Sequence, residues 1–276
     1  FVQQNLYNQY HFSILFKIPI ILYLAHQSKN RFFKTFLFLL LSISFFNILI
    51  IGSRGSLITL TGISLIYFSI LFFRFIENNF KKNVIIFLSL LVLTTLSQIF
   101  LYQKSDSLRV TDRITSYNDE STNYRINFFT NAIETFIENP FTGVGIGNWK
   151  ITSIENLNFS IKDYLIPYHV HNDFLQVAAE LGLPGLILFI LFFLTPLYYS
   201  LKRAVKIKKD RIIVLSLSLT LIAFIGDSMV NFPRARPNSL INLIYALSLL
   251  SFIVFEKSKF KVNRRLTFLG IFLVLV

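Results

Sequence analysis

The sequence predicts an all-α fold, a polytopic bundle of transmembrane helices with one large loop on the non-cytoplasmic side. Three observations predict it: an apolar composition, regularly spaced apolar segments and an uneven placement of basic residues. Of the 276 residues, 54% are hydrophobic and 32 are Phe, and the mean hydropathy is +0.59. A single soluble core cannot bury so much apolar surface, so the bilayer must act as solvent for the chain.

About eight apolar segments follow one another along the chain, and we interpret each as a membrane helix. They cover residues 12–26, 33–51, 56–73, 84–102, 184–201, 212–230, 239–255 and 266–276. Some are shorter than the ~20 residues that a helix needs to cross ~30 Å of hydrocarbon, so we expect them to extend into their flanks. The chain begins with Phe1 and stops within an apolar segment, which indicates a fragment with further helices beyond both ends.

The basic residues are concentrated in alternate connections between these segments. One side, formed by the connections near 29–34, 74–82, 202–211 and 257–265, carries 17 Lys or Arg and three acids. The other side carries nine Lys or Arg and eleven acids. The positive-inside rule makes the basic side cytoplasmic. The net charge of +13 is therefore a topology signal, and we expect no nucleic-acid partner.

This topology divides the chain into three parts. Residues 1–51 form N-terminal transmembrane helices, residues 52–201 form a core that includes the outer loop 103–183, and residues 202–276 form C-terminal transmembrane helices. A loop of that length is uncommon in the absence of structure or function of its own. The candidate site is therefore expected on the outer face.

A first interfacial helix is predicted in this loop from about Asn123 to the Asn139-Pro140 pair. Apolar residues recur there at helical spacing and give the helix one apolar face: Ile126, Phe129, Ile133 and Phe136. The glycines of the following stretch, Gly143 to Asn148, favour a tight turn with close backbone approach over an anion-binding nest. No strand precedes them, which excludes a dinucleotide fingerprint.

A second short helix is predicted from Asn172 to Gly182, and Pro184 is expected to open the next membrane helix. Its apolar stripe consists of Phe174, Leu175, Ala178 and Leu181. Its polar face consists of Asp173, Gln176 and Glu180, which lie at positions i, i+3 and i+7.

Two histidines, His169 and His171, come just before this helix. An imidazole has an ordinary pKa near 6.5 and can act as a base at neutral pH, although an isolated pair is more often an interfacial hydrogen-bonding group. His11 and His26 are distant in sequence, so we expect no metal site. The chain also has no Cys and therefore no thiol nucleophile.

Arginines on the outer face are candidate ligands for phosphate. Arg54 lies in the turn Gly52 to Ser56, where a charge at the membrane boundary needs a partner, a ligand or a lipid headgroup. Arg125 opens the first interfacial helix. Arg234 and Arg236 occupy a turn between two prolines, and Asp227 is a candidate partner for one of them.

The order of these motifs resembles a known family. They are Gly52-Ser53-Arg54-Gly55-Ser56, then Tyr124-Arg125 with Glu138-Asn139-Pro140-Phe141-Thr142-Gly143 through Asn148, and then His169-Val170-His171-Asn172-Asp173 with Glu180-Leu181-Gly182 and Gly185-Leu186. In this combination residues 50–200 resemble the O-antigen ligase and polymerase superfamily of bacterial envelope glycosyltransferases. The turn after Asp227 resembles a further, less specific feature of that superfamily.

The resemblance implies an enzyme of the bacterial inner membrane whose long loop is periplasmic. It implies transfer of a glycan from an undecaprenyl-diphosphate carrier to an acceptor, without metal or cofactor. The acceptor is lipid A-core in a ligase, a growing polysaccharide in a polymerase or a protein in an oligosaccharyltransferase, and the motifs favour the ligase or polymerase type without deciding between them. By motif, Arg54 and Arg125 match the arginines that hold the donor diphosphate, and His171 matches the base, with His169 as its helper. Supporting positions are Asn172, Glu180, Asp227 and Arg234.

A membrane transporter or a flippase for lipid-linked glycans is the alternative from another functional class. Such proteins place charges near the middle of the membrane and often contain internal repeats. Here the apolar segments are almost free of charge except for Lys17, and the sequence shows no repeat. These features favour the glycosyltransferase.

Overall fold

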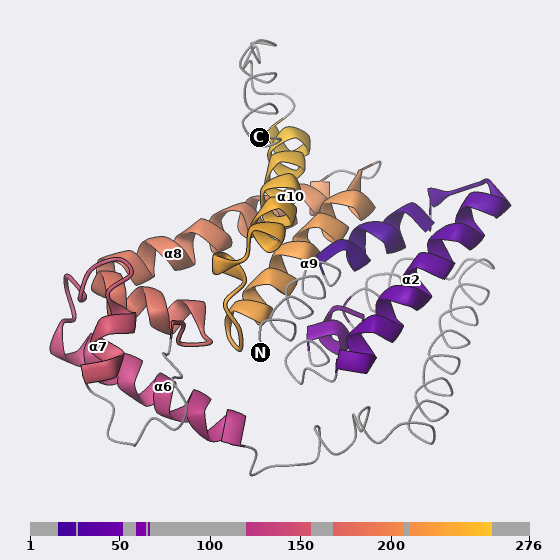
Figure 1. The fold of residues 1–276 in the computed structure, drawn as a ribbon. Helices are drawn as coiled ribbons and strands as arrows, with labels where there is room; N and C mark the ends of the chain where they lie inside the picture. Colours follow the sequence, from indigo (N-terminus) through magenta and orange to yellow (C-terminus); the bar gives the residue numbers. More distant parts are fainter. Residues whose placement is uncertain are drawn as a thin grey trace, which may run out of the picture.

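The computed structural model describes residues 16–25, 27–51, 59–64, 66, 120–155, 168–206 and 210–255. Within these ranges the regular secondary structure is helical, without strands, as predicted (Figure 1). The elements are the helix Phe16–Ala25, α2 (Arg31–Ile51), α6 (Glu120–Glu138), α7 (Trp149–Glu155), α8 (Asp173–Lys206), α9 (Arg211–Ser228), the short 3-10 helix η2 (Pro233–Ala235) and α10 (Pro237–Phe255). The predicted segments 84–102 and 266–276 lie outside the described residues.

Three helices, α8, α9 and α10, are long and apolar enough to cross a membrane. They contain three of the apolar segments that the sequence predicts. The helix Phe16–Ala25 is shorter but also apolar. The described part of the chain is therefore an all-helical membrane protein.

Aromatic side chains hold the apolar core of this bundle together. Phe224 of α9 contacts Phe193 of α8 at 5.6 Å and Phe16 at 5.4 Å between ring centroids. Two polar contacts add specificity: the hydroxyls of Ser200 and Ser218 are 2.8 Å apart, and Thr220 donates to the Phe16 carbonyl at 3.1 Å. In hydrocarbon such close packing, more than apolar burial, holds helices to one another.

Helix α8 consists of two helices joined at Gly182. This residue has φ 66° and ψ −167°, a conformation that is essentially restricted to glycine, and Pro184 follows in the first turn of the second half. The predicted helix stop and restart are thus confirmed. The start is confirmed too, because the Asn172 side-chain oxygen accepts hydrogen bonds from the backbone N–H groups of Phe174 and Leu175, both at 3.0 Å.

Helices α6 and α7 lie beside the first half of α8, at the lower left of Figure 1. Helix α6 ends at Glu138, immediately before the predicted Asn139-Pro140 stop. A small second core joins this region, with Trp149 of α7 fully buried against Phe128 of α6. The seven-residue α7 was not predicted, because its sequence is too short to show an apolar period.

Candidate active site

The glycine stretch after α6 docks backbone to backbone against the junction of α8. Val144 N–H donates to the Ala179 carbonyl at 3.0 Å, and Gly145 N–H donates to the Glu180 carbonyl at 2.8 Å. A Cβ atom at Gly143 would overlap the Glu180 carbonyl group. The glycines therefore serve close backbone approach, as expected, and these two N–H groups bind the protein itself rather than an anion.

The two histidines surround one phenylalanine from a distant part of the chain. Phe232, in the turn before η2, stacks on His169 at 4.3 Å and meets His171 edge-on at 4.9 Å between ring centroids. His171 has φ +62°, and among the described residues it alone adopts positive φ without being glycine. Left-handed backbone of this kind costs energy and is often found at functional sites.

Burial lowers the pKa of both imidazoles and so favours their neutral forms. Burial and, to a smaller extent, the positive charge of Arg125 lower the pKa of His171 to about 3. Burial also lowers the pKa of His169, although the neighbouring Gln176 side chain opposes that shift. The Nδ1 atoms of both rings are buried and have no hydrogen-bond partner among the described residues. A neutral imidazole keeps one nitrogen lone pair, so each ring can accept a proton or a hydroxyl hydrogen bond.

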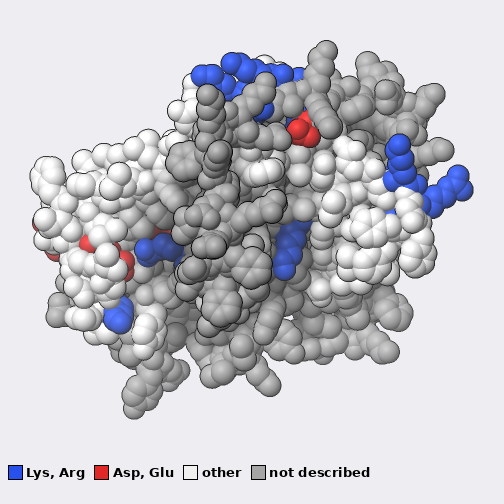
Figure 2. All heavy atoms as spheres, turned by 90° about the horizontal axis from the view of Figure 1, so that it is seen from above, with Lys and Arg blue, Asp and Glu red and all other residues white. Residues whose placement is uncertain are grey.

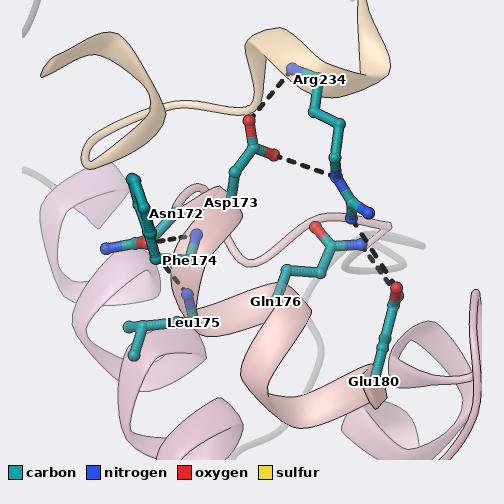
Figure 3. A network of polar contacts seen from close by, with 7 residues as sticks. All are labelled: Asn172, Asp173, Phe174, Leu175, Gln176, Glu180 and Arg234. Carbon is teal, nitrogen blue, oxygen red and sulfur yellow. Dashed lines mark hydrogen bonds and ion pairs between the residues drawn. The ribbon is translucent and has the colours of Figure 1, made fainter. Parts of the chain in front are cut away.

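The polar face of α8 forms an ionic network with the turn at η2 (Figure 3). The Arg234 backbone N–H donates to Asp173 Oδ2 at 3.0 Å, and its guanidinium lies 3.7 Å from Asp173 Oδ1 and 3.7 Å from Glu180 Oε2. Gln176 Nε2 donates to Glu180 Oε1 at 3.0 Å. Both carboxylates are almost fully buried, whereas the Arg234 side chain is 32% exposed. Buried charge is tolerated here because it is paired.

The turn between α9 and η2 is held from two sides. Arg125 of α6 donates to the Val230 carbonyl at 3.4 Å, and the Asn172 side-chain amide donates to the Met229 carbonyl at 3.0 Å. The Asp227 carboxylate accepts a hydrogen bond from Asn231 at 2.6 Å. This turn therefore joins α6, the start of α8 and the end of α9.

The site also contains Arg236, which the sequence analysis named only as an arginine of this turn, and Phe232, which it did not assign to the site. Arg236 is buried, and its guanidinium carbon lies 4.3 Å from the centre of the Phe232 ring, a cation–π contact. Pro233 and Pro237 flank the turn and restrict its backbone. The two prolines indicated that the turn carrying Arg234 and Arg236 has a restricted backbone. Nothing in the sequence indicated that Phe232 contacts the histidines.

The structure brings the predicted site residues together from three helices and two connections. His169, His171 and Asn172 come from the loop before α8, and the others come from α6, α8, α9 and η2: Arg125, Glu180, Asp227 and Arg234. Arg54 lies outside the described residues. Within the described part of the chain, no cluster of three His, Asp or Glu side chains has the arrangement of a metal site.

A sequence model of the family described as O-antigen ligase matches residues 36–190, more than half of the chain. The match includes α6, α7 and the first half of α8, which carry most of the site. A search of curated proteins gave no match. Members of this family are membrane glycosyltransferases of the bacterial envelope, of the ligase or polymerase type. The chain therefore belongs to the O-antigen ligase family.

Proposed function

We propose that the protein transfers a glycan from an undecaprenyl-diphosphate carrier to an acceptor at the periplasmic face of the inner membrane. The acceptor is lipid A-core in a ligase, or a second carrier-linked glycan in a polymerase. The observation that carries the proposal is the convergence of Arg125, His169 and His171 with a buried ionic network at one end of an apolar helix bundle.

The first half of the reaction is the departure of the carrier diphosphate. When the bond between the anomeric carbon and the phosphate oxygen breaks, the bonding electrons stay on the diphosphate. Arginine matches phosphate geometry with paired N–H donors, and fixed positive charge in a water-poor site stabilises the developing anion. In the proposal Arg125 and Arg54 supply this charge, with no metal or cofactor required.

The second half is attack by an acceptor hydroxyl on the anomeric carbon, with loss of its proton. We assign His171 as the group that orients the hydroxyl and accepts the proton, and His169 as its helper. The pKa of His171 near 3 describes the site without substrate, where burial first and then Arg125 disfavour the imidazolium. A bound diphosphate would offset the positive charge and so raise the imidazole's pKa.

The same proposal includes the orientation of the chain. In Figure 1 the α8–α9 connection and the start of α2 lie at the upper right, away from α6, α7 and the first half of α8. Basic residues are frequent at those two places, and Figure 2 shows them gathered apart from most of the acidic side chains. The positive-inside rule then makes that side cytoplasmic and the site periplasmic.

The proposal retains the bundle of about eight membrane segments and the three parts 1–51, 52–201 and 202–276. It adds that the third part completes the site. Residues Asp227 to Arg236 come from that C-terminal part, yet they contact Asn172, Asp173 and Arg125. A core limited to 52–201 would therefore lack one wall of the site.

Glycan transfer in cells that carry the full-length protein tests this function. We expect His171→Ala, Arg125→Ala and Arg54→Ala each to abolish most transfer at unchanged membrane abundance. Arg31→Ala, at the exposed start of α2, is the matched control and should transfer normally. Normal transfer by the three site variants would refute the assignment. Purified protein offered a carrier-linked glycan with each acceptor separates ligase from polymerase, and transport without transfer would support the flippase alternative.

A further inference from the structure

Gln176 occupies the middle of the ionic network but is not itself charged. Its side-chain nitrogen donates to Glu180 Oε1 at 3.0 Å, while Glu180 Oε2 lies 3.7 Å from the Arg234 guanidinium. Gln176 and Glu180 belong to the face of α8 that turns towards η2, and Arg234 belongs to η2 itself. The network described so far accounts for the amide nitrogen of Gln176, but it gives its oxygen no role.

The charge on Glu180 fixes which way the Gln176 amide points. An ionised carboxylate only accepts hydrogen bonds, so it selects the NH₂ end of a neighbouring amide. Glu180 also forms an ion pair with Arg234 at 3.7 Å through its other oxygen, Oε2. The carbonyl oxygen of Gln176 must then point away from Glu180, and Figure 3 shows it turned to the opposite side.

The imidazole of His169 lies next to this amide. Gln176 Oε1 and His169 Nδ1 are both buried, and neither has a hydrogen-bond partner among the described residues. The Gln176 side chain is nevertheless close enough to raise the pKa of His169 against the effect of burial. Leaving both atoms unpaired in a buried site is costly, and a hydrogen bond between them would satisfy both.

We propose that Gln176 is a positioning residue that fixes the tautomer of His169. Its oxygen accepts a hydrogen bond from His169 Nδ1–H, which leaves Nε2 bare as a proton acceptor. Glu180 and Arg234 act indirectly. Glu180 accepts a hydrogen bond from the Gln176 amide nitrogen and is paired with Arg234, so the amide oxygen is left facing His169 in the proposal. The proposed tautomer rests on these two buried atoms, while its use in catalysis rests on the proposed function.

Several other groups near His169 also influence its pKa. Arg234 and Arg236 from the turn at η2 disfavour the imidazolium, Glu180 favours it, and the imidazole of His171 is a further neighbour. Substitution of Gln176 leaves all four in place. A change in the protonation of His169 in such a variant therefore reports on the amide.

Histidine ¹⁵N NMR of the purified protein in nanodiscs tests the proposal directly. The chain has four histidines, and the His169 signal is identified by its loss in His169→Gln. We expect the Nδ1–H tautomer in the unmodified protein and a lower His169 pKa in Gln176→Leu. In Gln176→Glu the added carboxylate should raise that pKa by about one unit or more. Glu180→Gln frees the amide to flip and should give mixed tautomers.

Gln27→Leu is the matched control, since Gln27 is exposed and distant in sequence, and it should leave the His169 signal unchanged. A Nε2–H tautomer in the unmodified protein, or a tautomer and pKa that stay the same in correctly folded Gln176→Leu, would overturn the proposal. The expected NMR result without any glycan transfer would count against the proposed function alone. Intact transfer with the Nε2–H tautomer would count against the role of Gln176 alone.

Discussion

The two halves of α8 place polar and apolar side chains in opposite ways. Before Gly182, the polar residues Asp173, Gln176 and Glu180 are buried. After Gly182, apolar residues such as Leu188, 68% exposed, face outward. Lipid is the natural surrounding for the second half, whereas the first half has to satisfy its own charges through Arg234 and the turn at η2.

This contrast shows which half of α8 contributes the polar residues of the candidate site. Exposed apolar side chains on a membrane helix need no further partner, but buried carboxylates are costly and persist only where surrounding groups compensate them. Gly182 is the boundary between the two regimes. Changes at the boundary, in the apolar half and in the polar half should therefore have separable effects.

The largest effect is expected at the boundary. Gly182→Ala places a Cβ 2.6 Å from the Phe141 carbonyl oxygen and forces a non-glycine residue into φ 66°, ψ −167°. Strain and overlap together should destabilise the protein by about 4 kcal/mol or prevent its accumulation. Thermal unfolding in detergent and membrane abundance measure this.

Gly147 provides the control for strain without overlap. It also has positive φ, 76°, but a Cβ there meets nothing within 4 Å. Gly147→Ala should cost only about 1 kcal/mol, the penalty for left-handed backbone. Equal losses in the two variants would show that backbone conformation, and not the contact with the 139–148 segment, makes Gly182 necessary.

A neighbouring pair of phenylalanines tests the apolar half of α8. Phe193 is 2% exposed and packs against Phe224, while Phe192 is 52% exposed. Phe193→Ala should cost about 3 kcal/mol through the cavity that it leaves. Phe192→Ala should cost less than about 0.5 kcal/mol, because lipid replaces the lost contacts. The free energies of unfolding of the two variants in lipid decide this, and similar values would mean that the Phe192 face is covered by protein.

The polar half is tested by removing its counter-charge. Arg234→Ala leaves Asp173 and Glu180 buried without their guanidinium, and we expect a loss of about 2 kcal/mol after allowance for the exposure of Arg234. Adding Glu180→Gln should recover part of that loss, because the double variant no longer buries the Glu180 carboxylate without the Arg234 guanidinium. A double-mutant cycle on unfolding measures the coupling. Additive effects would mean that the pair contributes little to stability.

Much of the local structure could be predicted because its signals are local. The end of α6 at Asn139-Pro140, the cap at Asn172 and the break at Gly182 each depend on residues next to one another in the chain. The apolar spans likewise predicted the helical class, which the described residues confirm. The polar face of α8 followed from helical spacing alone.

The assembly of the site could not be derived in the same way. The contacts of Phe232 with His169 and of Arg234 with Asp173 join residues about 60 positions apart, and no spacing rule encodes such contacts. The left-handed backbone of His171 likewise depends on its surroundings, since the sequence shows only a histidine before an asparagine. The family resemblance named most of the site residues, but it did not indicate Arg236 or the position of Gln176.

The last expected effect is a dependence of stability on pH, which is modest for each pH unit. The pKa of His171 is about 3 in the folded protein against an ordinary 6.5, so between these values the unfolded chain binds more protons. The stability of the folded state should therefore fall as pH is lowered through this window, by about 1 kcal/mol per pH unit from this residue. His171→Asn removes the titration while tolerating the left-handed backbone, and its unfolding should depend less steeply on pH. If the free energy of unfolding depends on pH equally in the two proteins, the His171 imidazole is solvated in the folded state. The polar end of α8 would then be open to water.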